Sequence, residues 1–235
     1  IEYRWNLCQV GQIGLMGGKQ EFIRVGAFDD IDISMMVHTS STTGESKFSV
    51  GGTSNGHLAK YVRFIGKSSH SGGAPHQGVN ALQAAVVALN AINAQRETFR
   101  NQDSVRLHGI LTDGGLSANS TPADVRYEGR VRGKNSQVIL DASLKMDRCL
   151  RAGALSLGSK VNIVTIPGYF PIINHEGLSA LFSENAESLV GKENVISRSV
   201  NDRNGGSTDM GDLSQIMPVI HPYTTGATGL GHGVD

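Results

Sequence analysis

The sequence has few cysteines and no excess of charge of either sign. Only Cys8 and Cys149 occur in 235 residues, and they form no CxxC pair, so neither a disulfide framework nor a thiolate zinc site is predicted. Lys and Arg together number 21, as do Asp and Glu. A chain of zero net charge exerts no strong field on nucleic acid or an anionic membrane. These counts favour the cytoplasm as the compartment and a small molecule or another protein as the partner.

Long apolar runs are absent as well. No stretch is long enough to span a bilayer, and no charged leader followed by an apolar core stands at the start. The chain opens at Ile1 without a methionine, so we expect that an upstream segment is missing. With 39% hydrophobic and 18% charged residues, the composition is that of a globular protein, and 30 glycines indicate many loops.

The middle of the chain alternates between strand and helix patterns. The periods predict a strand, a helix, two strands, a helix and a strand over residues 59–67, 79–99, 104–111, 123–132, 136–154 and 161–166. This β-α-β-β-α-β order is the ferredoxin-like split motif, a four-stranded antiparallel sheet with two helices on one face. A complete small α+β domain is therefore expected over residues 58–167.

The same patterns predict which side chains face the interior of this domain. Apolar residues at helical spacing form one stripe on each helix, namely Leu82, Val86, Leu89 and Ile92 on the first and Ile139, Ala142, Met146 and Leu150 on the second. In the strand over residues 123–132, Val125, Tyr127 and Val131 alternate with charged residues. One buried and one polar face are expected there.

The segment before this domain has α/β character. Residues 18–26 predict a short helix, and residues 31–37 (IDISMMV) predict a buried strand with His38 at its carboxyl end. In open α/β sheets, ligands and catalytic groups gather at that edge. Residues 39–55 are rich in Ser, Thr and Gly and predict a loop or linker.

The segment after the domain returns to the same character. Asn174 is predicted to cap a helix that Gly191 ends, with Leu178, Leu181, Phe182 and Leu189 facing inward. We therefore predict an α/β fold, in which residues 58–167 are inserted into a partial mixed-sheet domain formed by residues 1–57 and 168–235.

Three sequence segments carry a resemblance to a known family. They are GKSSHSGGAPHQGVNALQAA around His70, GGKQEFIRVGAFDDIDISMMVH ending at His38, and GSTDMGDLSQIMPVIHPYTTGATGLGHGVD ending just past His232. Together they resemble, in family order and over nearly the whole chain, the zinc-dependent amidohydrolases that include aminoacylases, carboxypeptidase G and p-aminobenzoyl-glutamate hydrolase. The resemblance implies a metallohydrolase catalytic domain interrupted by a ferredoxin-like lid that pairs two subunits into a homodimer.

The resemblance also implies roles for single residues. His38 and His232 match histidines that bind the family's metal ions, and neutral imidazole suits zinc. His70 resembles the lid histidine that stabilises charge on the attacked carbonyl, and Asn119 matches a lid asparagine that contacts substrate. Without the resemblance, the histidines read as hydrogen-bonded or surface polar residues and Asn119 as a turn residue.

Further charged residues have weaker implications. Asp209 and Asp212, in GSTDMGDLS, are interpreted as carboxylates at a helix start or beside metal ligands. The arginines of the strand over residues 123–132 suit a substrate carboxylate, with a solvated charged face as the alternative.

The sequence departs from the family where the general base belongs. The family has paired glutamates just before the GGK segment, whereas this chain reads NLCQVGQIGLMGGK and has no Asp or Glu between Glu2 and Glu21. Gln12 and Ile13, or Val10 and Gly11, stand at that place, and none can accept a proton at neutral pH. We therefore expect zinc or another divalent metal to bind weakly or not at all, and a truncated or degenerate chain that is inactive alone.

Two main functional hypotheses remain. The first is an amidohydrolase that acts on N-acyl or aryl-acyl amino acids, and the second is a non-catalytic dimerisation module derived from that family. RNA binding by the ferredoxin-like sheet is a third possibility, but it requires exposed aromatic residues and a basic face. Tyr127, on the apolar side, is the only aromatic residue in residues 123–132, so no nucleic acid partner is expected.

Overall fold

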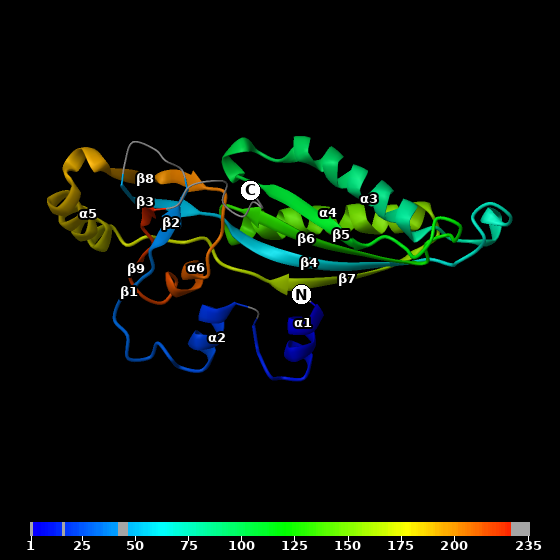
Figure 1. Cartoon of the computed structure of the whole chain (residues 1–235), viewed down its shortest axis with the longest axis horizontal. Helices are drawn as coiled ribbons and strands as arrows, with labels where there is room; N and C mark the ends of the chain where they lie inside the picture. Colours follow the sequence, from blue (N-terminus) through cyan, green and yellow to red (C-terminus); the bar gives the residue numbers. More distant parts are fainter. Residues whose placement is uncertain (1, 16, 42–46, 227–235) are drawn as a thin grey trace. The chain divides into compact units, whose positions relative to one another are not determined.

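The computed structural model describes residues 2–15, 17–41 and 47–226. The chain divides into two compact units (Figure 1). One unit contains residues 57–168, and the other contains residues 2–56 together with the chain from Tyr169 onward. We call them the α+β unit and the α/β unit. No helix within the described residues is long and apolar enough to cross a membrane.

The α+β unit has the predicted ferredoxin-like fold. Its elements are β4 (Gly56–Ile65), η1 (Pro75–Gln77), α3 (Ala81–Gln95), η2 (Arg96–Thr98), η3 (Asn101–Asp103), β5 (Arg106–Asp113), β6 (Asp124–Gly133), α4 (Ser136–Ser156) and β7 (Lys160–Pro167). The four strands form one sheet in the order β5-β6-β4-β7, and β5 pairs antiparallel with β6 as β4 does with β7. The side chains of both helices join those of the sheet in one core.

The predicted interior of this unit is confirmed on β6 and α4 and in part on α3, where Leu82, Leu89 and Ile92 pack in the core as predicted. Val125, Tyr127 and Val131 are buried, as is the predicted α4 stripe. On α3, the buried residues are Ala81, Ala84, Ala85, Ala88 and Ile92, whereas Val86 is exposed. Gly153 of α4 explains the difference, because a Cβ atom there would lie 2.5 Å from the Ala84 carbonyl oxygen. The two helices lie so close that only small side chains fit between them.

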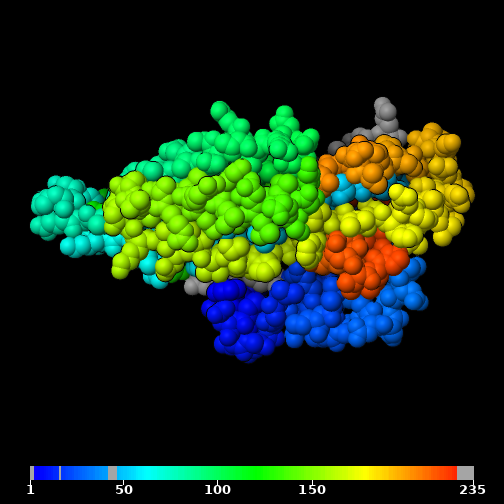
Figure 2. Space-filling model, turned by 180° about the vertical axis from the view of Figure 1, so that it is seen from behind, coloured from blue at the N-terminus to red at the C-terminus, as the bar shows by residue number. Residues whose placement is uncertain are grey.

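Polar residues mark the starts of both helices. The Asn80 side chain accepts a hydrogen bond from the Gln83 N–H at the start of α3, and Asn135 accepts one from Val138 at the start of α4. These bonds satisfy backbone donors that have no partner within the helix. The outward side of α4 lies at the molecular surface (Figure 2, yellow-green), where Leu140 and Leu144 are exposed.

The α/β unit contains two small sheets. Its elements are α1 (Glu2–Gln9), α2 (Gly18–Arg24), β1 (Ser34–Met35), β2 (His38–Ser40), β3 (Phe48–Ser54), α5 (Glu176–Val190), η4 (Lys192–Asn194), β8 (Val195–Asn204), α6 (Met210–Leu213), β9 (Val219–Ile220) and β10 (Tyr223–Thr225). β1 pairs in parallel with β9, and a second, mixed sheet has the order β2-β10-β3-β8. A small core of Ile172, Met210, Leu213 and Val219 joins α6 to β9.

The predicted buried strand over residues 31–37 is mostly wrong. Only Ser34 and Met35 form a strand, and the odd-numbered apolar residues Ile31, Ile33, Met35 and Val37 are exposed. The even-numbered Met36 packs against the core instead. The segment therefore buries one face only. The prediction assumed the two buried faces that are usual for a strand in a parallel sheet.

The loop or linker predicted over residues 39–55 is also wrong, because it contains strands β2 and β3. Gly51 and Gly52 adopt the left-handed φ values of 82° and 72°. A Cβ atom on Gly51 would lie 2.6 Å from the Arg198 carbonyl oxygen. Glycine there permits a close approach of β3 to β8. The glycines that suggested a loop in the sequence therefore allow these two strands to pair.

The cap of α5 differs by one residue from the prediction. His175 is the N-cap, since its Nδ1 accepts a hydrogen bond from the Leu178 N–H. Asn174 instead donates to the carbonyl oxygens of Gly51 and Gly52 and accepts the His221 N–H. Gly191 ends the helix as predicted, whereas Leu181 and Leu189, predicted to face inward, are exposed.

Candidate functional site

His70 and Asn119 come together at one end of the α+β unit. They lie in two separate segments, the loop after β4 and the turn before β6. An isolated antiparallel bridge joins His70 to Ser120, and the Ser71 N–H donates to the Asn119 carbonyl oxygen at 2.9 Å. Both side chains are exposed. The fold therefore places the two residues predicted to act on substrate in adjacent, hydrogen-bonded segments on an accessible surface.

The hydrogen bonds of His70 determine which ring nitrogen carries the proton. Its Nδ1 accepts from the Gly72 N–H at 3.2 Å and from the Gly73 N–H at 3.0 Å. A nitrogen that accepts two N–H groups has no proton of its own, so in the neutral ring the proton sits on Nε2. The two glycines thus prepare an outward N–H donor.

His38 and His221 lie side by side in the α/β unit. His221 follows β9, and His38 comes just after the parallel partner β1. Their ring centroids are 6.0 Å apart, and the Tyr223 ring lies 5.6 Å from His38 and 5.0 Å from His221. The two histidines therefore share the carboxyl edge of the parallel pair, where ligands bind in α/β sheets.

The two rings differ in their surroundings. His38 is exposed, and its Nδ1 lies 2.6 Å from the Thr39 carbonyl oxygen. A donor Nδ1 leaves the Nε2 lone pair available, which is the arrangement of many metal-bound histidines. His221 is buried, and burial lowers its pKa to about 4, with His38 and Lys19 acting in the same direction.

The described residues alone do not fit a complete metal site. His38 has a suitable tautomer, but two neighbouring imidazoles are fewer than the three or four ligands of a stable zinc site. Across the described ranges, no three His, Cys, Asp or Glu side chains gather as a metal ion requires. His232, the second predicted ligand, lies outside the described residues.

Asp209 and Asp212, at the start of α6 and within it, differ in their surroundings. Asp209 precedes α6 and forms an ion pair with Lys19, whose Nζ lies 2.7 Å from Oδ1. Asp212 is buried and accepts a hydrogen bond from Gln20 Nε2 at 3.0 Å. Burial raises the pKa of Asp212 to about 6, and the Gln20 hydrogen bond opposes this shift.

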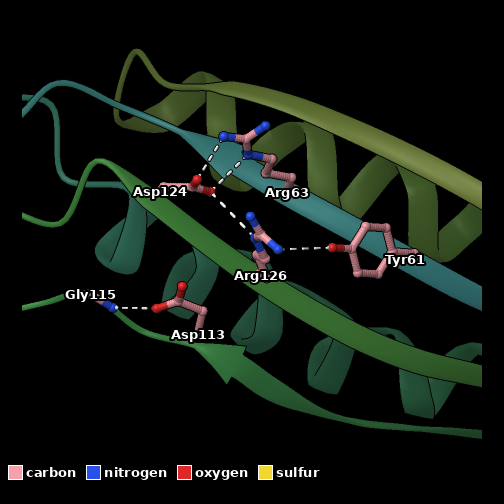
Figure 3. Close-up of polar contacts among 6 residues, drawn as sticks. All are labelled: Tyr61, Arg63, Asp113, Gly115, Asp124 and Arg126. Atoms are coloured by element: carbon pink, nitrogen blue, oxygen red, sulfur yellow. Dashed lines mark hydrogen bonds and ion pairs between the residues drawn. The ribbon is translucent and has the colours of Figure 1, made fainter. Parts of the chain in front are cut away.

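The arginines of β6 lie among polar partners on the sheet. Arg63 of β4 donates to both carboxylate oxygens of Asp124, at 2.8 and 2.6 Å. Arg126 lies 4.0 Å from the same carboxylate and 3.5 Å from the Tyr61 hydroxyl (Figure 3). Arg132 donates to His108 Nε2 at 3.1 Å. These contacts favour the alternative of a charged strand face over a substrate site.

Sequence reasoning missed His221 and Tyr223. Both lie in IMPVIHPY, a segment quoted for the resemblance, without a role of their own. One sequence signal was available. His221, like His38, directly follows a short apolar run of the kind that predicts a strand. The parallel pairing of β1 with β9 could not be predicted from the sequence. It brings Ser34 beside Val219, although the two residues are 185 positions apart in the chain.

Comparison with known proteins gives a consistent set of relatives. Residues 52–155 match the peptidase dimerisation domain. The Xaa-Arg dipeptidase of Mus musculus is 32% identical over 211 residues, which are 88% of this chain and 46% of the dipeptidase. The N-acyl-L-amino acid amidohydrolase of Geobacillus stearothermophilus is 26% identical over 165 residues, 68% of this chain and 44% of that protein.

A solved structure extends the likeness to the fold. The putative aminohydrolase from methicillin-resistant Staphylococcus aureus superposes with a TM-score of 0.71 at 18% identity, over 92% of this chain and 56% of that one. The chain spans about half the length of the curated relatives it matches.

Proposed function

Because the chain belongs to the family of amidohydrolases and metallopeptidases that carry the peptidase dimerisation domain, we propose that it serves in hydrolysis of the amide bond of an N-acyl amino acid or a dipeptide. The names of two relatives support this substrate class, since one is an Xaa-Arg dipeptidase and the other an N-acyl-L-amino acid amidohydrolase. In both classes an acyl group is joined by an amide to an amino acid.

The juxtaposition of His70 and Asn119 carries the proposal. When a nucleophile attacks an amide, negative charge develops on the carbonyl oxygen, and a positioned donor stabilises it. The Nε2–H of His70 is such a donor, because the Gly72 and Gly73 N–H groups occupy Nδ1. Asn119, beside it, supplies an amide that binds a polar group of the substrate.

We propose that this chain binds and orients substrate but does not hydrolyse it unaided. A general base near neutral pH needs a carboxylate or imidazole within reach of the attacking water. The positions that resemble the family's paired glutamates hold Gln12 and Ile13, or Val10 and Gly11. His38, together with His232, remains the proposed metal-binding pair, and we expect zinc to bind it weakly because the pair has too few ligands.

A homodimer through the α+β unit is the proposed assembly. β5 is an edge strand of the sheet, and its Ile110 and Leu111 are exposed. An exposed apolar edge can pair with the same edge of a second copy and extend the sheet across a two-fold axis.

Nitrogen-15 NMR of the histidine rings, recorded with and without N-acetyl-L-methionine, tests the substrate role. We expect free His70 to have its proton on Nε2 and its signals to shift on titration with the ligand. Asn119→Ala should reduce this response. His76, an exposed histidine in the same loop, is the matched control and should not respond.

Two outcomes would contradict the proposal. One is a His70 ring that carries its proton on Nδ1, since its outward nitrogen would then be an acceptor. The other is equal ligand-induced shifts at His70 and His76, which would indicate non-specific contact.

A further inference from the structure

A cavity of about 550 Å³ lies in the α/β unit. Its wall comes mainly from β3, β8 and β10, and its volume is in the range of small-molecule sites. Three cationic side chains line it, Lys47, Arg198 and Arg203, against the single acidic Asp202. The charge of this lining favours an anionic ligand.

An irregularity in β8 brings the two arginines to the cavity. Gly51 of β3 pairs with Arg198, but Thr53 pairs with Arg203, so residues 199–202 leave the ladder. The Asp202 carboxylate accepts the Ser199 N–H at 2.9 Å and holds this excursion together. Strand irregularities of this kind often redirect side chains next to binding sites.

Hydrogen bonds position both guanidinium groups. Arg198 Nε donates to the Ser49 hydroxyl at 2.6 Å, and Arg203 Nη1 donates to the Ser54 carbonyl oxygen at 2.9 Å. The bond to Ser49 uses one of the five N–H donors of Arg198. An arginine fixed in this way loses little further freedom when a carboxylate binds to its remaining donors.

Two buried polar atoms in the same wall have no hydrogen-bond partner among the described residues. They are Ser54 Oγ and His221 Nε2, and the exposed fractions of the two residues are only 5% and 4%. A buried polar atom without a hydrogen-bond partner is unfavourable, so two such atoms in one cavity wall indicate that a polar group of a ligand binds there.

The remaining wall is apolar. Phe48, Ile172 and Ile196 line the cavity, and an edge-on contact with Phe182 fixes the Phe48 ring. The site thus combines a cationic part, two unsatisfied polar atoms and an apolar part.

We propose that this cavity is a binding site for a small carboxylic acid that bears an apolar acyl or aryl group. The carboxylate binds Arg198 and Arg203, the apolar group packs against Phe48 and Ile196, and a central polar group meets Ser54 and His221. The ligand class rests on the proposed function, but the site is a separate one, because it includes neither His70 nor Asn119 and requires no metal and no hydrolysis.

Calorimetric titration of the whole chain with hippurate and with N-benzoylglycinamide tests the site. The two probes have nearly the same shape, but only hippurate carries a carboxylate. We expect hippurate to bind at least about tenfold more tightly, since a charge-assisted hydrogen bond contributes roughly 1.5–3 kcal/mol. Arg198→Met should lower the affinity for hippurate to that for N-benzoylglycinamide.

Arg106→Met is the matched control. Arg106 is an exposed arginine on β5 of the other unit, so its removal lowers the net charge equally and should leave hippurate affinity unchanged. Thermal melts verify that both variants are folded. In nitrogen-15 spectra of the wild type, hippurate should shift the His221 ring signals.

The proposal is overturned if hippurate and its amide bind equally, if Arg198→Met binds hippurate as the wild type does, or if no saturation occurs up to millimolar concentrations. Shifts at His70 without shifts at His221 would also overturn it, and they would leave the proposed substrate role of His70 intact.

Discussion

At the scale of single residues, Lys60 is a fully buried charge whose counter-charge should affect stability strongly. It lies on β4 with a fully buried side chain, and its Nζ is 2.7 Å from Asp147 Oδ1 and donates to Thr165 Oγ1. Asp147→Ala would leave this ammonium without its counter-charge. We expect a loss of about 2–3 kcal/mol in unfolding free energy, below the range of a fully enclosed pair because Asp147 retains contact with water.

Urea unfolding measures this loss. Asp141→Ala, which breaks the more exposed pair between Asp141 and Lys145 on the same helix, is the control and should cost less than about 0.5 kcal/mol. The double variant Lys60→Met with Asp147→Leu should regain most of the stability. Equal effects of the two alanine variants would contradict this account.

Asp212 gives the protein a pH-dependent stability of unusual sign. Burial raises its folded-state pKa to about 6, above the ordinary value of 3.8 for an aspartate, so the folded state holds the proton more tightly than the unfolded one. Its contribution is therefore present at pH 4 and is lost as pH rises through 6. Relative to Asp212→Asn, the wild type should lose roughly 2–3 kcal/mol between pH 4 and pH 7. Chemical unfolding of both proteins across this range checks the prediction, and a constant difference would refute it.

Single residues also show how far the sequence can predict a site. His38 and His70 stand next to recognisable strand and glycine patterns, so both could be selected as candidates from the sequence. His221 also follows a short apolar run, but its significance depends on the neighbouring His38 ring and on its burial, which only the fold reveals. The cavity beside it was equally unpredictable, since residues 39–55 gave no sign of a strand.

At the scale of elements, the close contact between α3 and α4 determines which residues form the core. A Cβ atom on Gly153 would lie 2.6 Å from the Ala88 Cβ and 2.5 Å from the Ala84 carbonyl oxygen. Gly153→Val should therefore force the helices apart and cost about 3 kcal/mol. Ala152→Val places the same side chain on the exposed side of α4 and should cost less than about 1 kcal/mol. Thermal unfolding compares the two, and equal losses would contradict the proposed contact.

The elements that the sequence predicted correctly are those with a long, local pattern. The β-α-β-β-α-β order is confirmed because each element repeats its period several times. The α3 stripe was confirmed for Leu82, Leu89 and Ile92 but wrong for Val86. It also missed the alanines that form the close contact with α4, because hydrophobicity alone favours larger residues. β3 was missed because Gly51 and Gly52 serve a close approach to β8 that only the folded chain reveals.

At the scale of the whole molecule, the edge strand β5 predicts self-association. Ile110 is 65% exposed on this strand, and Ile110→Lys would place a charge on the proposed interface. We expect the variant to shift the protein toward monomer in sedimentation velocity. Leu181→Lys, at an exposed leucine of α5 in the other unit, is the control and should not change the oligomeric state. A wild type that stays monomeric at all concentrations would rule out the homodimer.

Our central proposal is that His70 and Asn119 orient substrate in a chain whose positions resembling the family's paired glutamates hold no carboxylate. Its most direct test is turnover of N-acyl amino acids and Xaa-Arg dipeptides by the purified chain, with and without added zinc. The account predicts no product above the buffer rate at any zinc concentration. Zinc-dependent product formation that depends on His38 would contradict it.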